Sequence, residues 1–217
     1  EECFHCSVSQ KMYINVKWLD NLNLAMPTTT DSFYEVLKSF KTDDPNQNSK
    51  ADELPMSGFI DNWHSNMDGF LMNAFVYNDG SGRLSVKDGK IFPAFIQPEW
   101  REGIRYYRKL VEEGLIDTQA FVQDQSTFLQ LTSGDTIRVG AVQCGHHGMV
   151  TDMSKENIYE YNVLPPLKGP NGVQFAGYYP AAATSGEDNA SLSKTCQYPE
   201  LAMRVVDFLF TEEAVIR

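Results

Sequence analysis

Residues 11–24 read Lys11-Met-Tyr-Ile-Asn-Val-Lys-Trp-Leu-Asp-Asn-Leu-Asn-Leu24, a short strand-like segment that runs directly into a helical turn. Lys11 to Val16 carries the aromatic and β-branched residues that favour a strand, and Trp18 to Leu22 has the apolar spacing of a helix. Alternation of strands and helices is the pattern of α/β proteins. We therefore expect this stretch to belong to an α/β sheet domain.

The rest of the chain continues this alternation. Residues 98–114 form the clearest predicted helix, because Pro98 suits a first turn and Gly114 can end the helix in the left-handed conformation. We expect buried strands at 138–144 and 161–164, a hairpin around the turn at 87–89, and a buried helix near 72–76. The predicted stripe of the 98–114 helix is Trp100, Ile104, Tyr107 and Val111, and a last helix at 198–210 should bury Ala202, Val205, Val206 and Leu209.

A further helix is signalled by Pro27-Thr-Thr-Thr30, where threonine hydroxyls can cap free N–H groups. Its expected buried stripe is Phe33, Val36, Leu37 and Phe40. Trp18 and Trp100 are also assigned to the core. The predicted helix leads directly into a polar segment that is the most informative part of the chain.

That segment, Asp44-Pro-Asn-Gln-Asn-Ser-Lys-Ala-Asp-Glu53, places an oxygen donor at nearly every second position. Calcium takes six to eight oxygens at about 2.3–2.6 Å on a tightly bent loop. An EF-hand loop has Gly at position six and Glu at position twelve, whereas this segment has Ser49 and an acidic pair at nine and ten. The alternative is a polar Asp-Pro-Asn turn. The predicted calcium ligands are Asp44, Asn46, Asn48, Lys50 (through its backbone carbonyl), Asp52 and Glu53.

The expected role of calcium here is structural. Without a cation, Asp44, Asp52, Glu53 and the neighbouring Asp43 would crowd negative charge onto a segment with few apolar anchors. Calcium would offset that repulsion and fix the loop against the preceding helix.

Composition excludes several functions. The 217 residues, 42% of them hydrophobic, are enough for a substantial core. A net charge of −11 argues against binding to nucleic acid or to an anionic membrane surface, since both need basic residues. No apolar run reaches the roughly 20 residues of a membrane-spanning helix. The chain has no initiator Met and no signal peptide, so we expect a fragment of a longer protein.

The cysteine spacing and the catalytic motifs also limit which functions are possible. Cys3 and Cys6 have zinc-like spacing, but no second pair of ligands accompanies them, so a local disulfide or free thiols are expected. Asp61, Asp68 and Glu99 are acidic, but nothing pairs them as glycosidase carboxylates. Nucleophile-elbow, Walker and zinc-helix motifs are absent from the sequence. We therefore expect no enzyme.

Several segments together resemble the family 1 extracellular solute-binding proteins, the receptors of bacterial carbohydrate ABC transporters. The group with which the chain shares most is the large lipoproteins related to alginate-oligosaccharide-binding proteins. Glycines are usual in that group where Gln47 and Ser49 stand here. The resemblance is carried by residues 11–24, 26–34, 44–53, 107–117, 163–172 and 199–202, and it spans nearly the whole chain.

The resemblance implies a type II periplasmic-binding-protein-like lobe, helix-rich around a short mixed sheet. Residues 1–175 would form one lobe of a two-lobe receptor, with its calcium loop at 44–53. Residues 176–217 would form the return segment and helix that rejoin the other lobe. Implied partners are an oligosaccharide and ABC transporter permease subunits. The protein would be an extracellular or periplasmic lipoprotein, held at the membrane only through a lipid anchor outside these residues.

Sugars present apolar C–H faces to aromatic rings and hydroxyls to polar side chains. Residues 62–66 supply both kinds of side chain in one loop, and residues 144–147 follow a predicted strand. The alternatives are core packing for Trp63 and an ordinary surface loop for the histidines. The expected sugar-binding residues are Trp63, His64, His146, His147 and Tyr178, with Tyr179 as a further contributor.

One other function fits the same features. A calcium-stabilised adhesion or scaffold module would have the cation loop without a small ligand. Few basic residues flank the suspected sugar-binding loops, so among sugars a neutral oligosaccharide is favoured over a polyuronate.

Overall fold

The computed structural model describes residues 10–60, 62–80, 82–154, 156–177, 192–209, 211, 213 and 214. The chain divides into two compact units, residues 1–180 and 181–217. Within the described residues, no helix is both long and apolar enough to cross a membrane. The two units are described separately.

The first unit is built on a four-stranded sheet in the order β2-β5-β1-β6. These strands are β1 (Lys11–Asn15), β2 (Leu54–Met56), β5 (Val139–Cys144) and β6 (Tyr161–Leu164). Strand β1 is antiparallel to both neighbours, while β2 and β5 are parallel. The sheet is therefore mixed, and three of its strands end at the edge where β1 begins.

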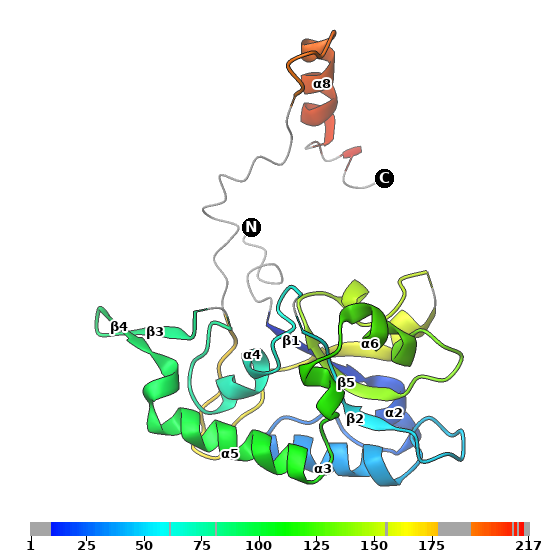
Figure 1. Ribbon diagram of the computed structural model, residues 1–217, viewed down its shortest axis with the longest axis vertical. Helices are drawn as coiled ribbons and strands as arrows, with labels where there is room; N and C mark the ends of the chain where they lie inside the picture. The colour runs from blue at the N-terminus through cyan, green and yellow to red at the C-terminus, as the bar shows by residue number, and fades with distance from the viewer. Residues whose placement is uncertain are drawn as a thin grey trace. The chain divides into compact units, whose positions relative to one another are not determined.

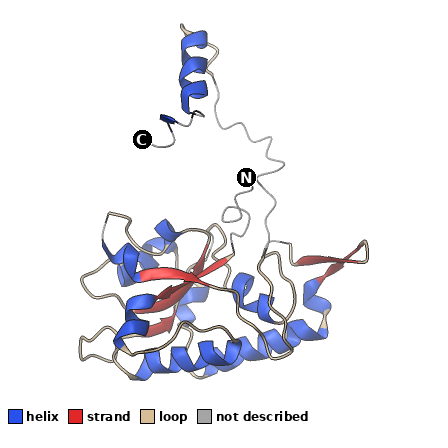
Figure 2. Cartoon of the chain, turned by 180° about the vertical axis from the view of Figure 1, so that it is seen from behind, coloured by secondary structure: helices blue, strands red, loops and turns tan. Residues whose placement is uncertain are grey.

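Helices cover this sheet. In Figures 1 and 2, α3 (Thr30–Thr42) and α5 (Pro98–Glu112) lie below it, and α6 (Gln125–Thr132) lies above. The C-terminal half of α5 contacts α3, where the Tyr106 hydroxyl donates to the Thr30 carbonyl. A capping box starts α3, with Thr29 Oγ1 accepting from the N–H of Ser32. The other elements of this unit are α2 (Val16–Asn21), α4 (Asp68–Leu71), the hairpin β3 (Leu84–Lys87) and β4 (Lys90–Pro93), and the 3₁₀ turns η1 (Met72–Ala74), η2 (Ala94–Ile96), η3 (Thr118–Phe121), η4 (His147–Met149) and η5 (Glu156–Glu160).

The core lies between the sheet and α3. The predicted stripe of α3 is confirmed, since all four of its residues are buried. Trp18 meets Phe40 edge to face, with ring centroids 5.2 Å apart. Truncating an aromatic side chain buried like these costs about 3–5 kcal/mol. Strand β5 is buried at every position, as its sequence predicts.

Two expected buried faces differ from the structure. Ile104 on α5 is 47% exposed, whereas Gly103, Tyr107 and Leu110 are buried. The reason is that α5 packs closely at Gly103, where an added Cβ would lie 2.6 Å from Met72 Sδ. The second difference concerns α8 (Pro199–Leu209), the helix of the second unit, which buries none of its described residues. An amphipathic helix buries its apolar face only against another element.

Candidate functional site

One edge of the sheet brings together loops from distant parts of the chain. Lys11, at the start of β1, pairs with Cys144 at the end of β5, and Met12 pairs with Leu164 at the end of β6. The segments that follow these strand ends therefore meet above one edge. Ligands of open α/β sheets commonly bind beyond the carboxyl ends of strands.

The first and last described residues of the first unit also meet at this edge. A Cβ added to Gly177 would lie 2.9 Å from Gln10 Cγ. Gln10 and Gly177 are the first and last described residues of this unit.

Trp63 presents its ring at this edge. Its side chain is 46% exposed, and its backbone carbonyl accepts the N–H of Gly145 at 3.1 Å. A Cβ at position 145 would overlap Trp63 Cε3, so the indole lies directly against the Gly145 backbone. The half-exposed ring is the kind of apolar plate that stacks on a sugar face. Core packing, the alternative for Trp63, does not account for that exposure.

Two histidines lie next to this indole. The His64 ring centroid is 4.6 Å from that of Trp63, and the His146 centroid is 6.1 Å away. His146 is exposed, and its Nδ1 accepts the N–H of Gly148 at 3.1 Å. The structure thus brings together three of the predicted sugar-binding residues.

The other two predicted residues have different outcomes. His147 stacks on Tyr13 of β1, with centroids 5.1 Å apart and planes 21° apart. Its ring is part of the packing on the sheet and does not join the cluster around Trp63. Burial lowers the pKa of His147. Tyr178 and Tyr179 lie outside the described residues.

Buried amides beneath the cluster hold it in place. Gln10 Nε2 lies 2.5 Å from His64 Nδ1. The amide of Gln143 donates to the backbone carbonyls of His64, at 3.4 Å, and of Asn66, while its Oε1 accepts the N–H of Phe70 at 2.9 Å. Gln143 therefore joins the loop at 62–66 to strand β5. In the sequence, Gln143 stands out only as a polar residue within an otherwise apolar strand.

Lys11 is a second residue that sequence reasoning did not select. It is 6% exposed, and its Nζ donates to the carbonyl of Gly145 at 3.1 Å. Burial lowers the pKa of its amine. Lys11 ties the start of β1 to the loop that supports Trp63.

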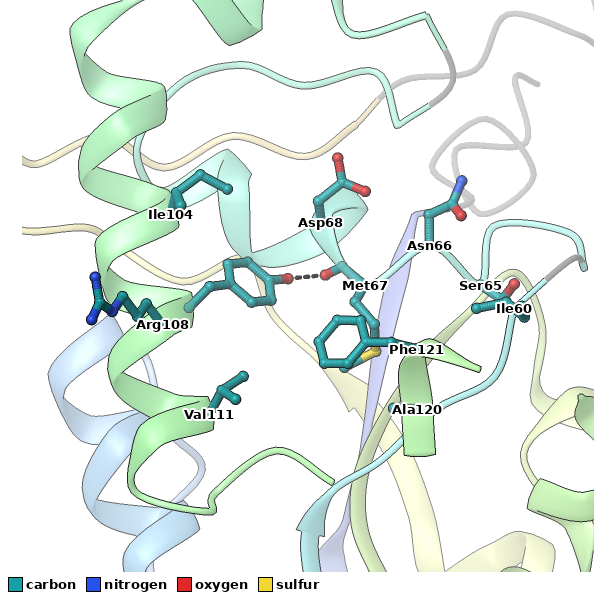
Figure 3. A pocket seen from close by; sticks show the side chains of 11 residues that line it. Ile60, Ser65, Asn66, Met67, Asp68, Ile104, Arg108, Val111, Ala120 and Phe121 are labelled. Carbon is teal, nitrogen blue, oxygen red and sulfur yellow. Dashed lines mark hydrogen bonds between the residues drawn. The ribbon is translucent and has the colours of Figure 1, made fainter. Parts of the chain in front are cut away.

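A pocket of about 400 Å³ lies beside this edge, between α5 and the segments around Met67 and Phe121 (Figure 3). Ile104 and Val111 project into it from α5, and the Tyr107 hydroxyl donates to the Met67 carbonyl (dashed line in Figure 3). Its lining is mainly apolar, whereas sugars need partners for many hydroxyls. The Trp63 cluster fits a sugar better than this pocket does.

The predicted cation loop is bent around Asp44. Its carboxylate accepts the N–H groups of Asn48 and Ser49, both at 3.0 Å. Asn48 Oδ1 accepts the N–H of Lys50 at 2.7 Å. Asp44, Gln47 and Ser49 have φ angles of 49°, 56° and 59°, the left-handed region that favours glycine.

The acidic end of the loop contacts the asparagines near its start. Asp52 Oδ1 accepts from the side-chain amides of Asn46, at 3.4 Å, and Asn48, at 2.9 Å. Glu53 Oε1 is buried without a hydrogen-bond partner. Burial, and then the nearby Asp52 and Asp44 carboxylates, raise the pKa of Glu53. A buried acceptor beside two carboxylates is a setting that a bound cation would stabilise.

Among the described residues, no three His, Cys, Asp or Glu side chains are grouped so that they could hold a metal ion. The three carboxylates of the cation loop, Asp44, Asp52 and Glu53, therefore do not form such a group. The residues present nevertheless fit calcium in donor chemistry, since all of the donors are oxygen.

Comparisons with known proteins agree with this architecture. The family model for the bacterial extracellular solute-binding proteins matches residues 4–216. The fructooligosaccharide ABC transporter substrate-binding protein FusA of Streptococcus pneumoniae is 36% identical over 173 residues, which are 79% of this chain and 31% of FusA. Lipoprotein LipO of Bacillus subtilis is 29% identical over 180 residues, 81% of this chain and 35% of LipO. The chain therefore spans about a third of the length of these relatives.

Solved structures show the same likeness. FusA in complex with kestose superposes with a TM-score of 0.72 and 35% identity, over 81% of this chain and 34% of that structure. A FusA EF-hand mutant in complex with fructo-nystose gives a TM-score of 0.71 and 28% identity, over 98% of this chain and 42% of that structure. The fold is that of type II periplasmic-binding-protein-like receptors, as the sequence predicted, and this family consists of binding proteins and not of enzymes. The chain belongs to the bacterial extracellular solute-binding proteins.

Proposed function

We propose that this chain forms most of one lobe of an extracellular receptor that binds an oligosaccharide for uptake by an ABC transporter. The observation that carries the proposal is the cluster of Trp63, His64 and His146 above the strand ends. It combines an exposed aromatic face with polar side chains, the two kinds of group that a sugar needs. Similarity to FusA supports a carbohydrate ligand.

We assign residues 1–175 to this lobe and 176–217 to the segment that rejoins the other lobe. The position of Gln10 beside Gly177 supports the assignment, because both connections then leave at the edge that carries Trp63. A second lobe attached there would face the cluster and form a cleft. Since a binding site buries about 70–90% of its ligand, one lobe alone should bind sugar weakly.

The ligand of this site is a neutral oligosaccharide in our proposal. Lys11, which lies beneath the Trp63 cluster, has its amine directed at the Gly145 carbonyl and not at the ligand side. The net charge of −11 also disfavours a polyanionic ligand. The similarity to FusA, a fructooligosaccharide receptor, agrees with this choice. His147 and Tyr178, also expected at this site, are assigned no contact in the proposal.

We further propose a structural calcium ion in the loop at 44–53, with Asp44, Asn46, Asn48, the carbonyl of Lys50, Asp52 and Glu53 as ligands. Support comes from the buried acceptor on Glu53 and from the similarity to FusA, of which an EF-hand mutant has been solved. Asp52 is held by amide N–H groups that a cation would replace. If the site binds at about 10 μM and external calcium is about 1 mM, linkage gives roughly 2.7 kcal/mol of stabilisation.

The cellular setting follows from the same proposal. A receptor of this kind acts outside the cytoplasmic membrane, as a cell-surface lipoprotein or in the periplasm, and delivers sugar to permease subunits. Similarity to a lipoprotein of Bacillus subtilis supports attachment through a lipid anchor.

The test is a thermal-shift screen of the complete receptor against neutral and acidic oligosaccharides, with calcium or with chelator. A rise in Tm with one neutral series, and a further rise with calcium that magnesium does not match, is expected. A shift with calcium but with no sugar would instead favour the adhesion or scaffold module. A shift with polyuronates alone would overturn the neutral ligand.

A further inference from the structure

A second hollow adjoins the Trp63 cluster along helix α6. It has a volume of about 710 Å³ and lies between α6 and the segment that follows η4. From α6 and its C-cap it is lined by Ser126, Leu129, Gln130 and Ser133. These residues are spaced i, i+3, i+4 and i+7, so they form one stripe along the helix. The hollow is therefore a groove that follows α6, and we call it the α6 groove.

Hydrogen bonds connect the two walls of the α6 groove. Ser133 Oγ accepts the N–H of Asp152 at 3.1 Å, and Thr151 Oγ1 donates to the Thr132 carbonyl at 2.7 Å. These bonds join the end of α6 to the opposite wall. The two walls of the groove are thus held at a fixed separation where α6 ends.

The α6 groove lies next to the Trp63 cluster. Asn62, the neighbour of Trp63 in sequence, donates its side-chain amide to Gln125 Oε1 at the start of α6, at 2.5 Å, and so holds the loop of the cluster against that helix. At the other wall, a Cβ added to Gly148 would lie 2.5 Å from Met153 Sδ and 3.1 Å from His146 Cε1. His146 of the cluster and Met153 of the groove therefore flank the same glycine, and the two surfaces are continuous.

The chemistry of the groove matches that of the cluster. Met153 is 67% exposed, so a large apolar side chain faces solvent here without serving the core. Leu129 extends the apolar surface, and Ser126, Gln130 and Asp152 supply hydrogen-bonding groups around it. A flexible apolar side chain among hydroxyl and amide groups suits a sugar ring.

From these observations we infer that the α6 groove is an extended subsite that holds the outer units of a longer oligosaccharide whose first units stand at Trp63 and His146. This inference rests on the proposed function and adds to it the length of the ligand. The receptor then prefers longer chains over short ones, because each unit placed in the groove adds contacts that a short sugar cannot reach.

The experiment measures affinities of the complete receptor for kestose, nystose and a longer fructo-oligosaccharide by calorimetry. Ser126→Trp fills the groove from an exposed helix position. Thr127→Trp is the matched control, because Thr127 is also exposed but lies off the groove stripe of α6. Met153→Ala removes the apolar contact without blocking the groove.

Ser126→Trp is expected to weaken binding of the longest sugar about tenfold or more, with kestose changed by less than about twofold, and Met153→Ala to act in the same direction. Thr127→Trp is expected to leave all three affinities unchanged. Equal losses for kestose and the longest sugar, or no loss for either, would overturn the groove while leaving the proposed function intact. If the wild-type receptor bound none of the three sugars, both the groove subsite and the proposed function would be excluded for fructo-oligosaccharides.

Discussion

Asp44 Oδ2 accepts the N–H of Ser49 at 3.0 Å, and Ser49 has a left-handed backbone with a φ of 59°. The hydrogen bond and the backbone angle belong together, because the chain must bend sharply for five consecutive residues to wrap one carboxylate. Any non-glycine residue in this region is strained by contact between its Cβ and the backbone. The loop therefore holds a tight bend with residues that do not favour it.

Ser49→Gly is expected to stabilise the protein by about 0.5–1 kcal/mol, because relief of the left-handed strain exceeds the extra chain entropy of glycine. Thermal unfolding measured with chelator present checks this. Ser39→Gly, in the interior of α3, is the matched control and should instead destabilise by about 0.5 kcal/mol. A lower Tm for Ser49→Gly would mean that the Ser49 backbone is not left-handed in solution.

Glu53→Gln tests the proposed calcium site. With chelator, the variant should unfold at a higher temperature than the wild type, since it removes a carboxylate that lies partly buried near Asp52 and Asp44. With calcium, the variant should lose most of the ligand-induced rise in Tm, because one charged ligand is gone.

The control for this variant is Glu35→Gln, which neutralises an exposed carboxylate on α3. It should keep the full calcium response, since Glu35 lies outside the loop. An unchanged calcium response in Glu53→Gln would remove Glu53 from the proposed ligand set.

The pH dependence of stability should reflect the histidines packed at the edge of the sheet. Burial lowers the folded-state pKa of His147 below its ordinary value near 6.5, and burial together with Lys11 does the same for His64. As the pH falls through about 6.5, the unfolded chain binds protons that the folded chain does not, so stability is lost toward acid. The stability that depends on these two neutral histidines is fully present above about pH 6.5.

His147→Phe should flatten part of this acid loss, because it keeps an aromatic ring against Tyr13 and removes the titrating group. Tm values recorded between about pH 7.5 and about pH 5 for both proteins give the comparison. Parallel curves for the two would show that His147 does not supply the lowered pKa.

Local patterns predicted most of the fold. Apolar periodicity gave α3 and its stripe, and the run of small and branched residues gave β5, because each pattern is produced by burial of one element on the sheet. The exposure of Ile104 was not predictable in this way. It depends on the close approach of α5 to Met72 at Gly103, which is a contact between segments far apart in sequence.

The candidate site was predictable only in part, for a related reason. Residue type and loop position identified Trp63, His64 and His146, but the same criteria selected His147, whose ring turns onto Tyr13. Adjacent residues in a turn point in different directions, and only the fold shows which one faces solvent. Lys11 and Gln143 were missed because their strand positions predict packing, whereas their side chains reach the backbone of the loops above.

The support of Trp63 by Gly145 leads to a last prediction. In Gly145→Ala, the new methyl group would occupy space now filled by the indole, since a Cβ at this position overlaps Trp63 Cε3. The ring must move, so oligosaccharide affinity of the complete receptor should fall on the order of tenfold to a hundredfold, as in Trp63→Ala.

Gly82→Ala is the matched control, because its Cβ would meet nothing nearer than 3.5 Å, and the affinity of this variant should equal that of the wild type. Trp100→Ala, at a residue packed against the core, should lower Tm and spare affinity. Wild-type affinity in both Gly145→Ala and Trp63→Ala would show that the indole does not contact the sugar.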